Sequence, residues 1–434
     1  MRNAAITFAI RVAGASAAIG LQILLARLMG ADSYGLYVIA WTWMLALGSV
    51  VSLGLADAAM RFVPRYVARG RAPQAARFFR TGVGSVTLAG LLLATAGAGI
   101  LQILPLDRPL LTLVTVVAVG LPFVAFEYFL EGMARSLGWF RLTGIAIYIV
   151  RPMLIALACL ALHGAGVGLT APLVGTVTIL AVAATGLTTY FTLVMHLRPA
   201  AGPRRPAGRL RRLWVGAALP MLVVSSLDDI FPAIDVMLVG ALLGPAEAAI
   251  YFAAGRLLAL AHFAQYAVHF VNGHAMSLAL AGAADQSVAR CLQRATAVSA
   301  LATLIALGAT LAAGPLLLGL FGQDFIRGYA AMCLLAVGLL GRSLAVPAQE
   351  YLLLSGRSRV LMRIGAITLA VLAALCAVLA PAFGLTGAAT AAAIAQLLRS
   401  LLLIRATRRM GGLLVLPPLR LGRQRFIAAT GGSQ

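Results

Sequence analysis

The sequence predicts an all-α, polytopic membrane protein of about 12 transmembrane helices in two six-helix bundles, with the N- and C-termini in the cytoplasm. Composition, the spacing of apolar runs and the distribution of arginine support this fold class. Of the 434 residues, 62% are hydrophobic and 11% are charged, whereas a soluble domain is roughly 45–50% apolar and about 25% charged. This composition excludes a soluble enzyme, a secreted domain and a DNA-binding protein.

Apolar stretches of roughly 20 residues, the length that crosses a bilayer as a helix, recur along the chain. In the first half they are Ala4–Met29, Tyr34–Ala58, Thr81–Leu104, Leu110–Glu131, Leu142–Leu162 and Leu169–His196. In the second half they are Leu213–Val239, Ala246–Gly273, Cys291–Leu320, Gly328–Leu354, Met362–Ala382 and Leu385–Ile404. The first stretch contains Arg11 and leads straight into the second, so we expect a retained helix and not a cleaved signal peptide.

These stretches divide the chain into four parts. We expect an N-terminal bundle over 1–196 and a C-terminal bundle over 213–406. The basic segment 197–212, which contains three prolines, is the expected cytoplasmic linker, and 407–434 is the expected basic cytoplasmic tail.

The charge distribution predicts the orientation. All 34 basic residues are arginine and the formal net charge is +22. Arginines gather in alternate connections and in the tail, whereas the other connections hold only Arg108 and Arg327. By the positive-inside rule the arginine-rich side is cytoplasmic. The charge therefore reports topology and predicts contact with anionic lipids, and we expect no nucleic-acid partner.

An internal repeat relates the two halves. The stretch Leu25–Ala40 (LARLMGADSYGLYVIA) resembles Leu238–Ala254 (LVGALLGPAEAAIYFAA), with Gly30 matched to Gly244 at an offset of 214. Gly138 matches Gly356, and the triplet Gly168-Leu169-Thr170 recurs as Gly384-Leu385-Thr386. A parallel repeat of this kind predicts a substrate path between the halves.

Arginines inside the spans are the leading candidates for a binding site, because a charge at the bilayer centre costs about 2.5–3.5 kcal/mol or more and usually faces a cavity or a partner. Arg11 shares a helix face with Gly14, Ala15, Ala18 and Gln22, which suggests a cavity wall; the alternative is a snorkelling side chain. The other deep arginines are Arg151, Arg256 and Arg342, each with a functional site or a buried ion pair as the open readings. Arg27, at the outer end of the first span, is expected to be structural.

Other polar side chains within the spans predict the lining of the cavity. The expected lining residues are Gln22, His262, Gln265, His269, Gln349 and Arg399. Asp228 and Asp235 lie seven apart on a proline-containing helix, where they are either ion-responsive acids or counter-ions for Arg256 or Arg151. Glu127 is expected near the cytoplasmic mouth.

No cofactor or metal is expected. The four cysteines occur singly and without a CxxC pair, and two histidines seven apart lack a third zinc ligand. The chain also lacks a nucleotide-binding motif and a Ser-His-Asp arrangement, so we expect a transporter that draws on an H⁺ or Na⁺ gradient or on substrate supply, and not an enzyme.

With the repeat and the arginines placed, the sequence resembles the polysaccharide flippases of the multidrug/oligosaccharidyl-lipid/polysaccharide exporter superfamily. The resemblance rests on Arg11 followed by ILLARLMGADSYGLYVIA, on the Gly54-Leu55 turn with RFVPRY, on DVMLVGALLGPAEAAIY from Asp235, and on LFG at Leu320–Gly322. It implies a V-shaped pair of six-helix bundles, alternating access, and export of an undecaprenyl-diphosphate-linked oligosaccharide across the inner membrane of a bacterium.

On this resemblance Arg11, Arg151, Arg256 and Arg342 would bind the diphosphate head group, since guanidinium groups stay charged and chelate its oxygens. Asp228 and Asp235 would then reset the cavity. The expected partners are the lipid-linked oligosaccharide and, beyond the membrane lipids, a polysaccharide polymerase with its chain-length machinery. The product would be a surface polymer such as lipopolysaccharide.

Two alternatives remain open. An ion-coupled multidrug exporter of the same superfamily would have the same bundles, but its cavity should be rich in acids, whereas the deep charges here are mostly arginine. A membrane polysaccharide polymerase or glycosyltransferase normally has a sizeable outer loop, whereas the outer connections here are short.

Overall fold

The computed structural model describes residues 2–103, 108–197, 207–261 and 285–411, and this part of the chain is almost entirely helical and contains no strand. The first half comprises α1 (Arg2–Val51), α2 (Leu55–Ala68), α3 (Ala72–Ile103), α4 (Arg108–Ser136), α5 (Phe140–Ile145), the π-helical turn η1 (Ala146–Val150), α6 (Arg151–Gly164) and α7 (Ala171–His196). The second half comprises α8 (Ala207–Leu243), α9 (Pro245–Leu258), α11 (Asp285–Ala312), α12 (Gly314–Phe321), the 3₁₀ turn η2 (Gln323–Gly328), α13 (Tyr329–Leu354) and α14 (Ser358–Gly411).

The protein is a multi-pass membrane protein. Eight of the described helical segments are long and apolar enough to cross a bilayer. Two of them, in α1 and α14, are broken by a non-helical glycine, Gly30 and Gly384, and each corresponds to two predicted spans. The count of twelve and the orientation stay predictions.

Several helix boundaries differ from the sequence prediction, and the predicted span Cys291–Leu320 is divided between α11 and α12. The second predicted span runs to Ala58, but α1 ends at Val51, and α2 begins after a turn at Leu53 and Gly54, both with positive φ. The last residues of the predicted linker are helical because α8 begins at Ala207, and α14 extends into the predicted tail. Apolarity marked these segments, but it does not mark a turn within an apolar run.

The backbone repeats at matched glycines. Gly30 has φ 76° and ψ 165°, and Gly244 has φ 97° and ψ 172°. Gly138 and Gly356 have φ 79° and 73°. Positive φ favours glycine because it has no Cβ. The third pair differs, since Gly384 has φ 62° whereas the φ of Gly168 is not positive.

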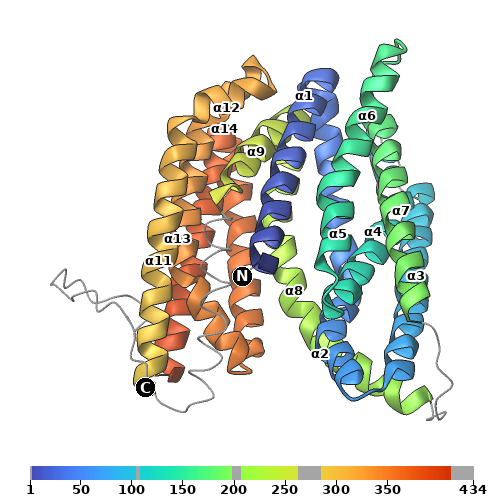
Figure 1. Cartoon of the computed structure of the whole chain (residues 1–434). Coiled ribbons are helices and arrows are strands. Elements are labelled where there is room, and N and C mark those ends of the chain that lie inside the picture. Colours follow the sequence, from blue (N-terminus) through green and yellow to red (C-terminus); the bar gives the residue numbers. More distant parts are fainter. Residues whose placement is uncertain (1, 104–107, 198–206, 262–284, 412–434) are drawn as a thin grey trace.

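The helices run between two ends of the molecule. We name them the short-loop end (residues 30–33, 164–170, 240–245, 321–328 and 381–384) and the arginine-rich end (residues 52–71, 135–140, 285–294, 355–363 and 405–411). Figure 1 shows α11, α13 and α14 standing together on one side and α3 to α7 on the other, with α8 running between them toward α2.

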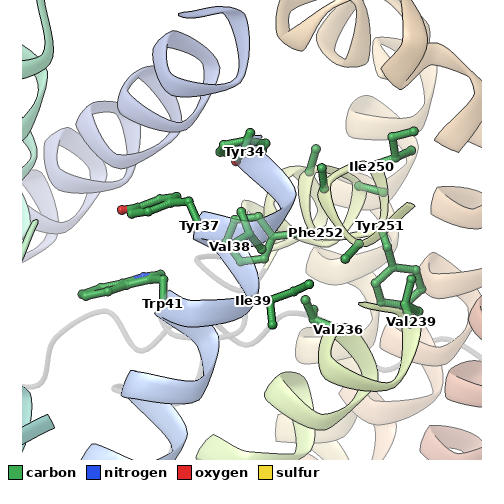
Figure 2. Packing of buried hydrophobic residues seen from close by; sticks show 14 of the residues in the cluster. Tyr34, Tyr37, Val38, Ile39, Trp41, Val236, Val239, Ile250, Tyr251 and Phe252 are labelled. Carbon is green, nitrogen blue, oxygen red and sulfur yellow. The ribbon is translucent and has the colours of Figure 1, made fainter. Parts of the chain in front are cut away.

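The largest buried cluster joins the two halves near the short-loop end. It brings Val38 and Ile39 of α1 together with Val239 of α8 and Ile250 and Phe252 of α9 (Figure 2). The backbones approach so closely that a Cβ built on Gly35 would lie 1.9 Å from the carbonyl oxygen of Pro245. Arg27 of α1 also donates to the carbonyl oxygens of Leu320, at 2.5 Å, and Gly319, at 3.3 Å.

At the arginine-rich end the buried side chains form two separate clusters. One cluster joins α1 to α4 with Trp214 and Ala218 of α8, and the other joins α11, α13 and α14 around Leu292 and Leu352. The indole nitrogen of Trp214 donates to the hydroxyl of Tyr66 at 2.9 Å. Within the described residues, the largest core shared by the halves lies toward the short-loop end, whereas at the arginine-rich end the start of α8 is the part of the second half that packs into the first cluster.

Candidate functional site

A cavity of about 330 Å³ lies where α1, η1, α6, α7 and α9 meet. Both halves of the chain contribute to its wall. Its polar lining comes from Gln22, Tyr37, Tyr148, Arg151, Thr178 and Arg256. Figure 2 shows Tyr37 and Trp41, which also lines the cavity, extending from α1 away from α8 and α9.

The α1 wall carries the small-residue face seen in the sequence. Gly14, Ala15, Ala18 and Gln22 all line the cavity. Gly14 packs against η1 so closely that a Cβ there would lie 2.5 Å from the Cβ of Tyr148. The side chain of Arg11, on the same face one turn earlier, lies outside the described residues.

Gln22 is held in place by an aromatic side chain at the short-loop end of the same helix. Its side-chain oxygen accepts a hydrogen bond from the buried Tyr34 hydroxyl at 2.9 Å. The neighbouring Tyr37 and Thr178 hydroxyls lie 3.2 Å apart. This edge of the cavity therefore presents neutral hydrogen-bonding groups.

Arg151 is the cationic group of the first half. It is the first residue of α6 and follows the π-helical turn η1, a type of irregularity that often marks functional sites. Arg151 lies eleven positions after the start of α5, which corresponds to about 16 Å along the helix axis. Its guanidinium donates to the Glu127 carboxylate of α4 and lies 5.8 Å from the centre of the Trp41 ring.

Arg256 is the cationic group of the second half. Arg256 lies eleven positions after the start of α9, which also corresponds to about 16 Å along the helix axis. Its guanidinium carbon lies 4.8 Å from the centre of the Phe252 ring, a cation–π contact. Among the described residues no carboxylate lies within ion-pair distance of Arg256.

Three predicted site residues lie elsewhere in the second half. Arg399 of α14 donates to Gln349 of α13 at 3.4 Å and lies 5.5 Å from the centre of the Phe231 ring of α8. Arg342 of α13 is partly buried. None of these residues lines the cavity around Arg151 and Arg256.

Asp235 has neutral partners. Its carboxylate accepts hydrogen bonds from the Tyr251 hydroxyl at 3.2 Å and from the amide of Val236 at 2.8 Å. Among the described residues Asp235 forms no ion pair with Arg256 or with Arg151, which pairs with Glu127, and its role in ion coupling stays a prediction. The side chain of Asp228, together with His262, Gln265 and His269, lies outside the described residues.

Glu127 has contacts that the sequence did not predict. It lies nine residues before the end of α4, about 14 Å from the arginine-rich end. It is buried, and its carboxylate accepts a hydrogen bond from the Thr185 hydroxyl of α7 at 3.1 Å as well as from Arg151. The sequence does hold a signal: each of two successive spans carries a deep charge, and the charges have opposite signs.

The fold of this chain is similar to the folds of solved transporters. An inward-facing multidrug resistance MATE family transporter of the MOP superfamily superposes with a TM-score of 0.73 at 13% identity, covering 91% of this chain and 94% of that one. The lipid II flippase MurJ, in an inward closed conformation, also gives 0.73, at 14% identity over 93% and 87% of the chains. A MOP superfamily transporter from Pyrococcus furiosus gives 0.65, at 14% identity over 94% of each chain. The fold is thus that of the MOP-superfamily transporters and flippases.

The sequence itself identifies the family. The profile of the polysaccharide biosynthesis protein family matches residues 1–268, well over half of the chain. The chain therefore belongs to the polysaccharide biosynthesis protein family. A search of curated protein sequences finds no significant match.

Proposed function

We propose that this protein is a flippase that moves an undecaprenyl-diphosphate-linked oligosaccharide from the inner to the outer leaflet of a bacterial cytoplasmic membrane by alternating access. The observation that carries the proposal is that Arg151 of the first half and Arg256 of the second line one cavity. Two guanidinium groups on different halves suit a diphosphate, because each phosphate can accept its own charge-assisted hydrogen bonds.

The location of the two arginines also suits transport. A head group held by both halves would be released when the halves move relative to each other, whereas the prenyl tail would stay in the lipid. The cavity polarity favours an anionic substrate over a cationic drug. The family match and the fold support a transported lipid-linked glycan as the substrate class.

The remaining assignments belong to the same proposal. The two bundles, 1–196 and 213–406, would rock about the cavity, with the termini, the linker 197–212 and the tail 407–434 in the cytoplasm. Arg11 would add a third donor to the cavity, and Arg342 would meet the substrate in another state of the transport cycle. Asp228 and Asp235 would respond to H⁺ or Na⁺, while the other polar residues, including His262, Gln265, His269, Gln349 and Arg399, would line the path.

The proposal also names partners. Anionic lipids would contact the arginines at the cytoplasmic face, where exposed Arg61 and Arg65 extend from the amphipathic helix α2. A polysaccharide polymerase with its chain-length machinery would take up the product in the outer leaflet, on the route to lipopolysaccharide or another surface polymer.

The test is glycan export in a deletion strain that carries either the wild-type gene or the variants Arg151→Gln and Arg256→Gln at matched protein levels. The deletion should abolish surface glycan and trap lipid-linked repeats on the inner leaflet. Each variant should reduce export at least tenfold, with Arg359→Gln, at the arginine-rich end, as the control that retains export.

Two outcomes would overturn the proposal. Unchanged glycan together with sensitivity to cationic dyes would make the protein a multidrug exporter. Repeats that reach the outer leaflet but stay unpolymerised would make it a polymerase or glycosyltransferase.

A further inference from the structure

The polar side chains of the cavity lie at two levels along the membrane. Arg151 contacts the ring of Trp41, which lies one helical turn further from the short-loop end than Tyr37. Arg256 lies about 16 Å along α9 from its start at the short-loop end. Gln22 and Tyr37 lie only about 12 Å and about 10 Å along α1 from the glycine that breaks this helix at the same end. Both therefore lie on the short-loop side of the two arginines.

Gln22 has hydrogen-bond donors that the described part of the protein does not use. Its side-chain oxygen accepts a hydrogen bond from the Tyr34 hydroxyl at 2.9 Å, which fixes the orientation of the amide. The amide nitrogen carries two donors, and the described residues provide no acceptor for them. Because Gln22 lines the cavity, these donors are available to a ligand.

Tyr37 has an available acceptor. The Thr178 hydroxyl donates to the carbonyl oxygen of Val174 at 2.8 Å, so its single hydrogen is already used. In the 3.2 Å contact between the Tyr37 and Thr178 hydroxyls, Tyr37 is therefore the donor. The Tyr37 oxygen keeps its capacity to accept a hydrogen bond. Its ring lines the cavity and points away from α8 and α9 (Figure 2).

A donor and an acceptor without a charge suit a neutral ligand group that both accepts and donates. A sugar hydroxyl does both, whereas an ionised phosphate only accepts and would leave the Tyr37 oxygen without a partner. A cationic drug would find no carboxylate in the described lining of this cavity. The neutral level and the arginine level together match the chemical order of a sugar joined to a diphosphate.

The size of the cavity limits how much of a glycan it holds. Its volume of about 330 Å³ is at the lower end of the roughly 300–1,000 Å³ that is typical of small-molecule sites. A diphosphate with one sugar is a ligand of that class, whereas an oligosaccharide of several sugars is larger. In this state the cavity therefore holds the sugar next to the diphosphate, and the other sugars lie outside it.

We propose that Gln22 and Tyr37 form a subsite for the sugar joined directly to the diphosphate, and that they recognise its hydroxyl groups. The inference rests on the proposed function and adds to it which sugar of the glycan the cavity recognises. Tyr34 and Thr178 act through these two side chains, so they are positioning residues.

The experiment compares binding of undecaprenyl diphosphate with binding of the same lipid carrying one glucose or one N-acetylglucosamine. The affinities for the full-length protein in nanodiscs follow from the ligand dependence of thermal unfolding. The wild type should bind the tighter of the two sugar-bearing lipids about tenfold more tightly than undecaprenyl diphosphate, the size expected for two neutral hydrogen bonds.

Two variants test the subsite. Tyr37→Phe removes only the hydroxyl, so the affinity ratio should fall to about threefold while binding of undecaprenyl diphosphate does not weaken. Gln22→Met removes the amide donors at similar side-chain length and should lower the ratio to about the same value. The double variant should bring the ratio close to one. If Gln22→Met fails to fold because the buried Tyr34 hydroxyl loses its acceptor, Tyr37→Phe still decides the question.

The matched control is Tyr190→Phe. It removes the same hydroxyl group from a tyrosine of α7 that does not line the cavity, so it should keep the wild-type ratio.

The outcomes separate this inference from the flippase proposal. If the wild type binds the lipids with and without a sugar equally well, or if Tyr37→Phe and Gln22→Met both keep the wild-type ratio, the sugar subsite is wrong. The flippase proposal then stands, provided that Arg151→Gln and Arg256→Gln weaken binding of undecaprenyl diphosphate. If the wild type binds none of the three lipids, or if the arginine variants bind undecaprenyl diphosphate as the wild type does, the head-group site itself is wrong.

Discussion

The short-loop end and the arginine-rich end of the molecule differ in how they join the two halves. At the short-loop end α1 packs against α8 and α9 with backbones in close contact, and Arg27 reaches carbonyl groups at the end of α12. At the arginine-rich end there are two separate cores, and the start of α8 is the part of the second half that packs into the core of the first. The comparison shows that the packing between the two halves is concentrated at the short-loop end.

The substitution expected to weaken the packing at the short-loop end most is at Gly35. A side chain there meets the Pro245 carbonyl at 1.9 Å, a backbone atom that cannot move aside alone. We expect Gly35→Val to destabilise the closed short-loop end by about 3 kcal/mol, the upper range for overpacking. Spin labels at Asp32 and Gln323 should show a longer distance, and Gly20→Val, in open space on the same helix, should not change it.

The next contact is that of Arg27. Arg27→Ala removes the donors to the carbonyls of Leu320 and Gly319, and we expect a loss of about 1.5 kcal/mol because the donor is charged and partly solvated. The same label pair should populate the longer distance, though less than in Gly35→Val. Arg27→Lys, which keeps the charge and one donor group, should lie between the wild type and the alanine variant. An unchanged distance in both variants would show that apolar packing alone closes this end.

Trp214→Phe tests the core at the arginine-rich end. It removes the hydrogen bond to Tyr66 but keeps an aromatic ring beside Phe78, whose centre lies 5.1 Å from that of Trp214. We expect a loss of about 1 kcal/mol of stability, measured as thermal unfolding in detergent. The label distance at the short-loop end should not change, because this core is separate from the one that joins the halves at the short-loop end. A change there would mean that the two ends are coupled.

The smallest effect is expected at the ion pair of Arg327 and Glu247. The pair joins η2 to the start of α9 at 2.9 Å, and the Arg327 side chain is 55% exposed. Exposed ion pairs contribute little, about 0–1 kcal/mol. Glu247→Gln should therefore leave both thermal unfolding and the label distance within error at physiological salt. A large change would show that this contact is shielded when the protein is in a bilayer.

Much of the fold could be predicted because the membrane restricts the backbone conformations that can span it. A buried backbone must be helical there, so runs of about 20 apolar residues locate the spans, and arginines show which connections share a side. Gly30 and Gly384, which break two long helices, coincide with predicted connections. The second predicted span ran through the turn at Leu53 and Gly54, although Gly54 had been assigned to a turn before RFVPRY, because serine and glycine also occur inside transmembrane helices.

The candidate site could be predicted only in part. The sequence indicates the depth of Arg151, Arg256 and Arg342 equally well, yet only the first two line the same cavity. The depth of a residue follows from its position along a helix, whereas its contacts with residues of other helices depend on which helices are neighbours. The contacts of Glu127 were not predicted for the same reason, since they depend on which residues of α6 and α7 lie next to α4.

The course of α8 has a mechanical consequence. Its first turns belong to the core of the first half through Trp214 and Ala218, while Phe231 near its middle contacts Arg399 of α14. A helix anchored at two points on two bodies cannot travel rigidly with both. Any rotation of one half against the other must therefore bend α8 between these anchors, in a stretch that contains Pro220, where one backbone hydrogen bond is missing. The same helix therefore connects the two halves and would have to bend if they moved relative to each other.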